Sequence, residues 1–167
     1  MPVTDQGADN GRYSVIPRTL IFLTRGNKVL LLKGSPQKRL WANLYNGVGG
    51  HIEPGEDVLS AARRELCEET GLEPDNLNLR GVILVDTAMN PGIAIFVLSG
   101  TCSTGEPLPS EEGYLEWVDV NDLNSYPLVE DLYSLLPKVL QMKKDDPPFS
   151  GHYWYDEDNR LNISFAS

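Results

Sequence analysis

Three glutamates, Glu65, Glu68 and Glu69, lie in a stretch whose composition predicts a helix. Residues 57–70 are rich in helix formers, and Gly71 follows them as the residue type most often found just past a helix end. At about 100° per residue, spacings of three and four place all three carboxylates on one stripe of the helix. Like charges at these spacings cost roughly 0.2 to 0.5 kcal/mol per pair, so the fold should contain something that offsets their repulsion.

The direction in which these carboxylates point bears on two interpretations. A solvated acidic face is the simpler explanation for three acids at helical spacing. When Val58 is taken as zero, however, Glu65 and Glu69 fall within about 20° of it, and Glu68 flanks them. The buried side of the helix is marked by Ala61, Ala62 and Leu66. The pattern therefore favours carboxylates that lean toward the core.

A divalent metal ion would explain such a cluster. Carboxylates that are half-buried and close together cannot all stay ionised without a cation, and Mg²⁺ is a hard ion that prefers oxygen ligands. The loop before the helix, residues 49–56, adds glycine carbonyls and further carboxylates. A metal that also bound phosphate oxygens would make this a phosphoryl-transfer site.

The remainder of the chain predicts an α/β fold in one domain. Residues 1–11 are polar and indicate a flexible N-terminal segment, followed by a domain over 12–167. A second helix is expected over 129–142, broken or tightened at Pro137. Strands are expected at 18–23, 28–32, 45–50, 77–86, 93–100, 114–120, 149–155 and 161–165. This order predicts a mixed sheet with helices on its faces.

Charge and composition exclude several functions. The chain has 14 Lys plus Arg against 24 Asp plus Glu, a net charge of −10, and so acidic a surface repels a nucleic-acid backbone. No apolar run approaches the roughly 20 residues of a membrane helix, and the N-terminus lacks the pattern of a signal peptide. We therefore expect a cytoplasmic protein with no nucleic-acid polymer and no membrane as partner. Its oligomeric state is not indicated.

The spaced residues around the predicted helix form a motif. Gly50 is followed after five residues by Glu56, and after seven more by residues 64–72, RELCEETGL. This resembles the Nudix hydrolase signature G-x5-E-x7-R-E-U-x-E-E-x-G-U, with U aliphatic, at every fixed position. The surrounding order of elements is similar to that family's α/β/α sandwich, with a mixed β-sheet between helices. The resemblance implies Mg²⁺- or Mn²⁺-dependent hydrolysis of a nucleoside diphosphate linked to another group.

The resemblance also implies roles for residues of the helix. Glu65, Glu68 and Glu69 match the metal-binding glutamates, one of which can act as the base. Arg64 matches the arginine that orients these glutamates through charge-assisted hydrogen bonds. Glu56 matches the acid at the helix entrance, whose role is partly structural.

Further metal ligands are implied outside the helix. Gly49 or Gly50 matches the glycine whose carbonyl binds metal, and Gly71 is the closing glycine of the motif. Several family members use another glutamate from a distant loop, for which Glu112 is the candidate here. A solvated loop acid is the alternative for Glu112.

Outside the signature the chain is most similar to the MutT-like branch, which hydrolyses oxidised purine nucleoside triphosphates. Residues 45–50, YNGVGG, resemble the run in which an asparagine hydrogen-bonds the base, so Asn46 is either a base contact or a turn residue. Glu130 and Asp131 resemble the acidic pair that grips the purine edge. That branch has a stacking tryptophan two residues before the pair. This chain has Leu128 there, which implies a looser hold on the base or a base other than oxidised guanine.

Other side chains near the motif have two interpretations each. Lys33, Lys38 and Arg39 are the cations nearest the loop in sequence, and they are candidates either for phosphate contact or for a solvated loop. Trp41 flanks the same loop and is a candidate for substrate contact or for packing.

Two other functions stay open at this point. Hydrolysis of ADP-ribose or another nucleoside-diphosphate-linked compound is less favoured. Some ADP-ribose enzymes carry a proline about 15 residues after the signature, whereas the first prolines after it here are Pro74 and Pro91. A non-catalytic nucleotide-binding module is disfavoured because Glu65, Glu68 and Glu69 are all retained.

Overall fold

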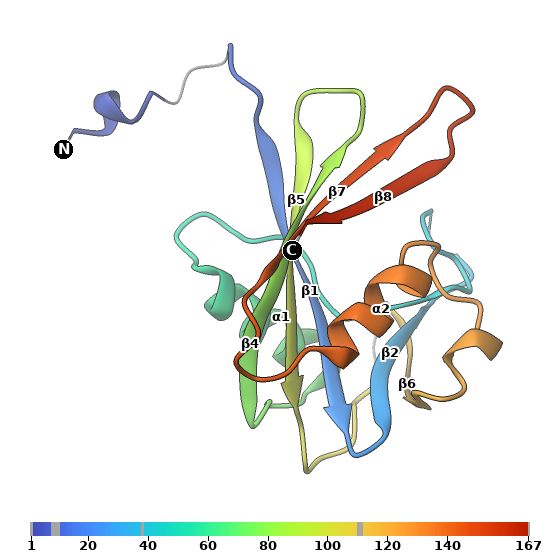
Figure 1. Ribbon diagram of the computed structural model, residues 1–167. Helices are drawn as coiled ribbons and strands as arrows, with labels where there is room; N and C mark the ends of the chain where they lie inside the picture. The colour runs from blue at the N-terminus through green and yellow to red at the C-terminus, as the bar shows by residue number, and fades with distance from the viewer. Residues whose placement is uncertain (1, 8–10, 38, 110–111, 167) are drawn as a thin grey trace.

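The computed structural model describes residues 2–7, 11–37, 39–109 and 112–166, and a mixed β-sheet forms its centre (Figure 1). The elements are η1 (Val3–Gln6), β1 (Val15–Arg25), β2 (Lys28–Gly34), β3 (Tyr45–Asn46), α1 (Val58–Thr70), β4 (Asn76–Asp86), β5 (Gly92–Thr101), β6 (Gly113–Asp119), η2 (Leu123–Ser125), α2 (Leu132–Gln141), β7 (Phe149–Tyr155) and β8 (Leu161–Ala166).

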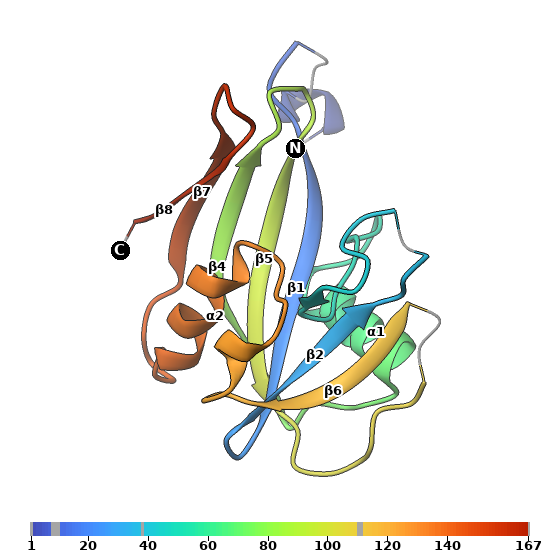
Figure 2. The same ribbon diagram turned by 90° about the vertical axis from the view of Figure 1, so that its right-hand side faces the viewer.

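The sheet divides where β1 and β2 separate. Its strands follow the order β3-β2-β1-β5-β4-β7-β8, and β6 pairs with β2. The pairs β1–β5 and β4–β7 are parallel and the others antiparallel. β1 and β2 pair through Thr24↔Val29 and Arg25↔Lys28, next to their turn. Beyond it the two strands diverge, as Figure 2 shows. The loop after β3 follows β1 in this opening, with bridges Ile21↔Val48 and Arg18↔His51.

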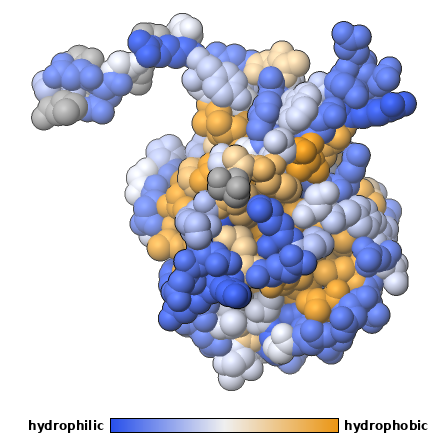
Figure 3. Space-filling view, in the orientation of Figure 1, coloured by the Kyte–Doolittle hydropathy of each residue, from blue (hydrophilic) through white to orange (hydrophobic). Residues whose placement is uncertain are grey.

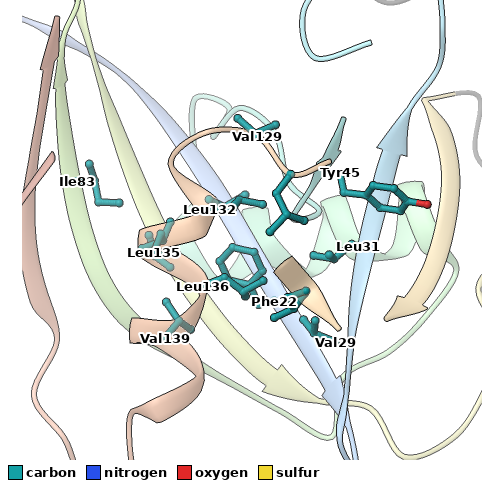
Figure 4. Close-up of a cluster of buried hydrophobic side chains, with 14 of the residues drawn as sticks. Phe22, Val29, Leu31, Tyr45, Ile83, Val129, Leu132, Leu135, Leu136 and Val139 are labelled. Carbon is teal, nitrogen blue, oxygen red and sulfur yellow. The ribbon is translucent and has the colours of Figure 1, made fainter. Parts of the chain in front are cut away.

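Alternating side chains of the strands build a core on each face of the sheet. In β1, Leu20 and Phe22 belong to the cluster under α2, whereas Ile21 and Leu23 belong to the cluster under α1, as a period of two requires. Figure 2 shows α2 in front of the sheet and α1 behind it. In Figure 4 the α2 side chains point at the strands, namely Leu132, Leu135, Leu136 and Val139. The predicted α/β/α sandwich is confirmed.

α1 has the bounds that its end signals predict. The carboxylate of Asp57 accepts hydrogen bonds from the backbone N–H groups of Leu59 (2.9 Å) and Ser60 (3.0 Å) and so caps the first turn. At the other end Gly71 has a left-handed φ of 68°, and its N–H donates to the carbonyl of Cys67. The carboxylates of α1 are therefore held in register from both ends.

α2 begins at Leu132, three residues later than the sequence predicts. Residues 127–129 pair instead with β3: Tyr45 N–H donates to the Pro127 carbonyl, and Val129 N–H donates to the Tyr45 carbonyl, each at 2.9 Å. This tertiary pairing outweighs local helix propensity. Pro137 lies inside α2 without ending it.

Hydrophilic side chains cover the tip of the last hairpin, which lies at the surface. The tip of the β7–β8 hairpin is hydrophilic in Figure 3, and residues 156–160 there are exposed.

Cys67 and Cys102 form no disulfide. Within the described ranges, the helices are too short or too polar to span a membrane.

Candidate active site

A cavity of about 430 Å³ is lined by β1 and the loop that follows β3, together with side chains from α1 and from the segments before β6 and α2. It receives side chains from both faces of the sandwich, because the sheet is split at this point. Its lining consists of Arg18, Thr19, Leu20, Trp41, Asn46, Gly47, Gly49, Gly50, His51, Glu53, Glu65, Glu69, Ile95, Glu112, Val129 and Asp131.

The glycines of the loop allow it to lie directly on β1. The backbone N–H of Thr19 donates to the carbonyl of Gly50 (2.8 Å), and that of Ile21 donates to the carbonyl of Val48 (2.7 Å). Gly49 has a φ of 149°, and a Cβ on it would collide with the Thr19 carbonyl. A larger residue would push the loop away from the strand.

The same glycines contact the carboxylates of α1. A Cβ on Gly50 would lie 2.5 to 2.7 Å from the carboxylate atoms of Glu65. The N–H of Gly49 donates to Oε2 of Glu69 at 3.3 Å. The Gly50 carbonyl is directed at Thr19, because it accepts from both the backbone N–H and the hydroxyl of that residue (2.8 and 3.5 Å). This direction favours Gly49 over Gly50 as the carbonyl that a metal would meet.

Arg64 holds the acidic residues in place. Its guanidinium donates to both carboxylate oxygens of Glu56 (2.7 and 2.9 Å), to Glu65 Oε1 (2.8 Å), to Glu68 Oε2 (3.1 Å) and to the His51 carbonyl (3.0 Å). These charge-assisted hydrogen bonds lower the pKa of Glu56 to about 2 and raise the pKa of Arg64 above its ordinary value. The network links α1 to the loop between β3 and α1, which carries His51 and Glu56.

The three glutamates of α1 differ in exposure. Glu65 is buried, with 9% of its surface exposed, and Glu69 is half-buried; both line the cavity. The Glu68 side chain is 60% exposed and pairs with Arg64, and it is not among the described residues that line the cavity. The predicted inward lean therefore holds for the two residues nearest the Val58 direction, while Glu68, about 80° away, faces solvent.

The oxygen donors of the cavity fit Mg²⁺ or Mn²⁺. Within the described ranges, no three acidic, histidine or cysteine side chains stand close enough to form a complete metal cage. Mg²⁺ does not need one, because it keeps several waters and commonly binds through one or two carboxylates plus substrate phosphates. Glu65 and Glu69 from α1, with Glu112 from the loop before β6, line one cavity. Glu112 is exposed, so it is both a loop acid at the surface and a wall of this cavity.

The pairing of β3 with residues 127–129 positions further parts of the cavity lining. The Tyr45 hydroxyl donates to Glu116 Oε2 (2.7 Å), an anchor that together with burial raises the pKa of Tyr45 to about 12. The next residue, Asn46, lines the cavity while its Oδ1 accepts from Gly47 N–H at 2.8 Å. The turn contact is thus present, and the amide group also borders the cavity.

Asp131 reaches the same cavity from the first residue before α2. Burial raises its pKa to about 6. It also lines an adjoining cavity of about 300 Å³, to which Glu130 contributes. Leu128 is buried in the core cluster under α2, and its neighbour Val129 lines the cavity in its place.

Among the described residues, Lys33 and Arg39 are not part of the cavity lining. Lys33 Nζ lies 5.6 Å from the centre of the Tyr45 ring and lines a separate cavity. Arg39 is exposed, and Lys38 lies outside the described residues. Arg18 lines the cavity instead. The sequence feature that could have identified Arg18 is its position two residues before Leu20, because this places a charged side chain on the face of β1 that otherwise carries core side chains.

Trp41 also borders the substrate-sized space. It is 46% exposed and lines both the main cavity and the adjoining one. Its backbone has a left-handed φ of 58°, and its carbonyl accepts from Leu44 N–H at 3.1 Å.

Comparison with known proteins agrees with this geometry. The NUDIX domain family model matches residues 16–139. The oxidized purine nucleoside triphosphate hydrolase of Mus musculus is 32% identical over 148 residues, covering 87% of this chain and 91% of the relative. The MutT protein of Bacillus halodurans has a crystal structure that matches with a TM-score of 0.76 and 25% identity, over 90% of this chain and 97% of that one.

A more distant neighbour shares the fold alone. The NUDIX domain of Shewanella oneidensis NrtR, solved in complex with ADP ribose, matches with a TM-score of 0.69 and 16% identity, over 84% of this chain and 98% of its own. The family match and the mouse relative each cover most of the chain, and the fold and signature agree with them. The chain therefore belongs to the Nudix hydrolase family.

Proposed function

We propose that this protein hydrolyses purine nucleoside triphosphates, oxidised ones among them, to the monophosphate and pyrophosphate, with Mg²⁺ or Mn²⁺ as cofactor. The observation that carries the proposal is one cavity whose lining includes Glu65 and Glu69 together with Asn46 and Asp131. The mouse relative, an oxidized purine nucleoside triphosphate hydrolase, supports the same substrate class.

The acidic end would hold the metal and the phosphates. Glu65, Glu69, Glu112 and the Gly49 carbonyl would be the oxygen donors, and Glu68 is joined to Glu65 through their shared hydrogen bonds with Arg64. A divalent ion bound there would neutralise charge on the phosphates and lower the pKa of a water molecule. Without it, a triphosphate would meet a wall of like charge.

The residues of the chain have distinct tasks in the reaction. Arg64 fixes the Glu65 carboxylate through the 2.8 Å hydrogen bond, and Glu56 fixes Arg64 in turn. Glu69 is half-buried and lines the cavity. We therefore assign to it the role of general base: a carboxylate oxygen of Glu69 accepts a proton from the attacking water. The proton leaves as the water oxygen bonds to phosphorus and the bridging P–O bond breaks.

The opposite end would bind the base. Asn46 and Asp131 provide polar contacts, and Trp41 provides an aromatic face that this chain lacks at position 128. Glu130 borders the adjoining cavity at the same end. Lys33 has no part in this proposal.

A substrate panel tests the function. The purified protein is incubated with Mg²⁺ or Mn²⁺ and with dGTP, dATP, their 8-oxo and 2-oxo derivatives, ADP-ribose and a dinucleoside polyphosphate, and the products are separated. We expect triphosphates to give monophosphate and pyrophosphate, with an oxidised purine as the best substrate. Faster turnover of ADP-ribose would contradict the proposal. Binding without turnover of any nucleotide would identify a binding module instead.

A variant pair tests the assignment of the proton acceptor. Glu69→Gln should lower kcat by about 10²-fold or more, with a small change in unfolding temperature. Glu73→Gln removes an equal charge from an exposed position just past the helix and should leave kcat unchanged. Full activity of Glu69→Gln would refute the assignment.

A further inference from the structure

Arg18 brings a positive charge to the base end of the cavity. It shares the parity of Leu20 and Phe22 in β1, so its side chain lies on the α2 face of the sheet, where Ile95 pairs with it from β5. It lines both the main cavity and the adjoining cavity of about 300 Å³. Glu65 and Glu69 line the main cavity but are not among the residues that line the adjoining one. Arg18 is therefore placed beside the base end.

Two residues that line the adjoining cavity carry buried polar atoms without hydrogen-bond partners. Nε of Arg18 and the hydroxyl of Tyr153 are both inaccessible to solvent and form no hydrogen bond within the described part of the chain. Buried polar atoms of native proteins are nearly always paired. Asp131 lines the same cavity, so a donor, a hydroxyl and a carboxylate surround one space.

The remaining wall of this space is apolar. It includes Val85, Ile93, Ile95 and Leu161, together with the exposed ring of Trp41. A flat ligand with hydrogen-bonding atoms at its edge would cover these side chains and pair the polar ones. A purine base has this shape, whereas a phosphate group would gain nothing from the apolar wall.

We propose that Arg18 recognises the O6 acceptor of a purine whose neighbouring N–H groups are bound by Asp131, and that Arg18 thereby favours guanine-type over adenine-type nucleotides. Arginine only donates hydrogen bonds and an ionised carboxylate only accepts them. Guanine-type bases present the O6 acceptor beside two donors, N1–H and the 2-amino group. Arg18 donates to O6, and Asp131 accepts from the two N–H groups. Adenine presents one donor and one ring nitrogen on that edge, which leaves a carboxylate oxygen unpaired. This inference rests on the proposed function for the position of the base.

Binding of the monophosphates tests this role without turnover. The affinities of dGMP and dAMP are measured by calorimetry in the absence of metal, for the wild type and for Arg18→Met, which keeps the length of the side chain. We expect Arg18→Met to weaken dGMP binding about 10- to 100-fold and dAMP binding by less than about threefold. Arg160→Met, at the exposed hairpin tip, should change neither affinity.

The outcomes separate this role from the others. Equal losses for dGMP and dAMP would overturn the inference, since they indicate a phosphate contact or a disturbed fold, and so would unchanged binding. Repeating the titration with deoxyguanosine, which has no phosphate, should give the same fold-loss. If Arg18→Met does not fold, Arg18→Lys should give an intermediate loss for dGMP alone. If the wild type binds dGMP selectively but hydrolyses no triphosphate, the proposed function fails while the recognition by Arg18 stands.

Discussion

At the scale of single residues, Arg64 shows why the signature requires arginine at this position. Five hydrogen bonds leave its guanidinium, and they join the helix, the loop and three carboxylates. A planar fork can satisfy the two oxygens of Glu56 and still donate to Glu65, which a single ammonium group cannot do.

Replacing Arg64 with lysine tests this requirement. Arg64→Lys keeps the charge but removes the two parallel bonds to Glu56, so we expect kcat to fall about 10- to 100-fold with KM little changed. Arg63→Lys, one residue earlier and exposed on the same helix, is the matched control. Steady-state kinetics of both variants measure the difference, and an equal effect in both would argue against the orienting role.

Asp131 makes stability depend on pH in an unusual direction. Its pKa rises to about 6 because burial disfavours the ionised form, and the facing groups are Glu130, Tyr153 and Arg18. The folded protein therefore binds a proton at pH values where the unfolded chain has lost it. The stabilising effect of protonated Asp131 is present below the ordinary pKa of aspartate and is lost as pH rises through about 6.

Asp131→Asn should accordingly stabilise the protein at pH 8 by on the order of 1 to 3 kcal/mol, and by much less at pH 4. Urea unfolding at the two pH values measures this. Glu130→Gln, on the exposed neighbour, should show no such difference. A gain for Asp131→Asn that is the same at both pH values would contradict the ionisation argument.

At the scale of elements, the glycine loop and α1 form one unit. The loop is fastened to β1 by backbone hydrogen bonds, and α1 is fastened to the loop by Arg64 and by the packing of Glu65 on Gly50. Because Gly50 does not have a left-handed φ, its requirement is one of space.

Gly50→Ala should therefore displace the Glu65 carboxylate. We expect kcat to fall at least about tenfold and stability to fall by about 1 to 3 kcal/mol, as overpacking does. In a Glu65→Ala background the same substitution should cost little stability, since the colliding carboxylate is gone. A double-mutant cycle of unfolding free energies measures this coupling, and simple additivity would show that the strain lies elsewhere.

At the scale of the whole molecule, the opening of the sheet explains how a charged site and an apolar core coexist. β1 and β2 hold together near their turn and then diverge, so one cavity receives glutamates from the α1 side and Asp131 from the α2 side. With a net charge of −10, the molecule should gain stability when a cation enters this cavity.

Mn²⁺ at about a hundredfold excess over its Kd should raise the unfolding temperature by about 5 to 10 °C, and EDTA should reverse the shift. The double variant Glu65→Gln/Glu69→Gln should lose this response. Removing two charges from the exposed hairpin tip, by Glu157→Gln/Asp158→Asn, should leave it intact. Thermal unfolding followed by circular dichroism measures all three, and a shift that persists in the first double variant would place the metal elsewhere.

Comparison of prediction and structure shows where local signals suffice. The bounds of α1 and β4 follow from capping residues and from alternating apolar side chains, which act over a few residues. β3 ends at Asn46 and not at the predicted residue 50, because the residues after it form bridges with β1. α2 departs from its predicted start because residues 127–129 find hydrogen-bond partners on β3, far away in sequence. For the same kind of reason, Lys33 and Leu128 do not line the main cavity. Lys33 lies over the Tyr45 ring, and Leu128 packs in the core.

The sequence by itself determined the family signature, the helix that carries Glu65 and Glu69, and the two-sided pattern of the strands, because each depends on spacing along the chain. Only the tertiary structure decided which side chains share the cavity. Arg18, Trp41, Asn46 and Asp131 come from four separate segments, and they meet because β1 parts from β2 and the segment before α2 pairs with β3. Such long-range pairing leaves no local periodicity in the sequence from which it could be predicted.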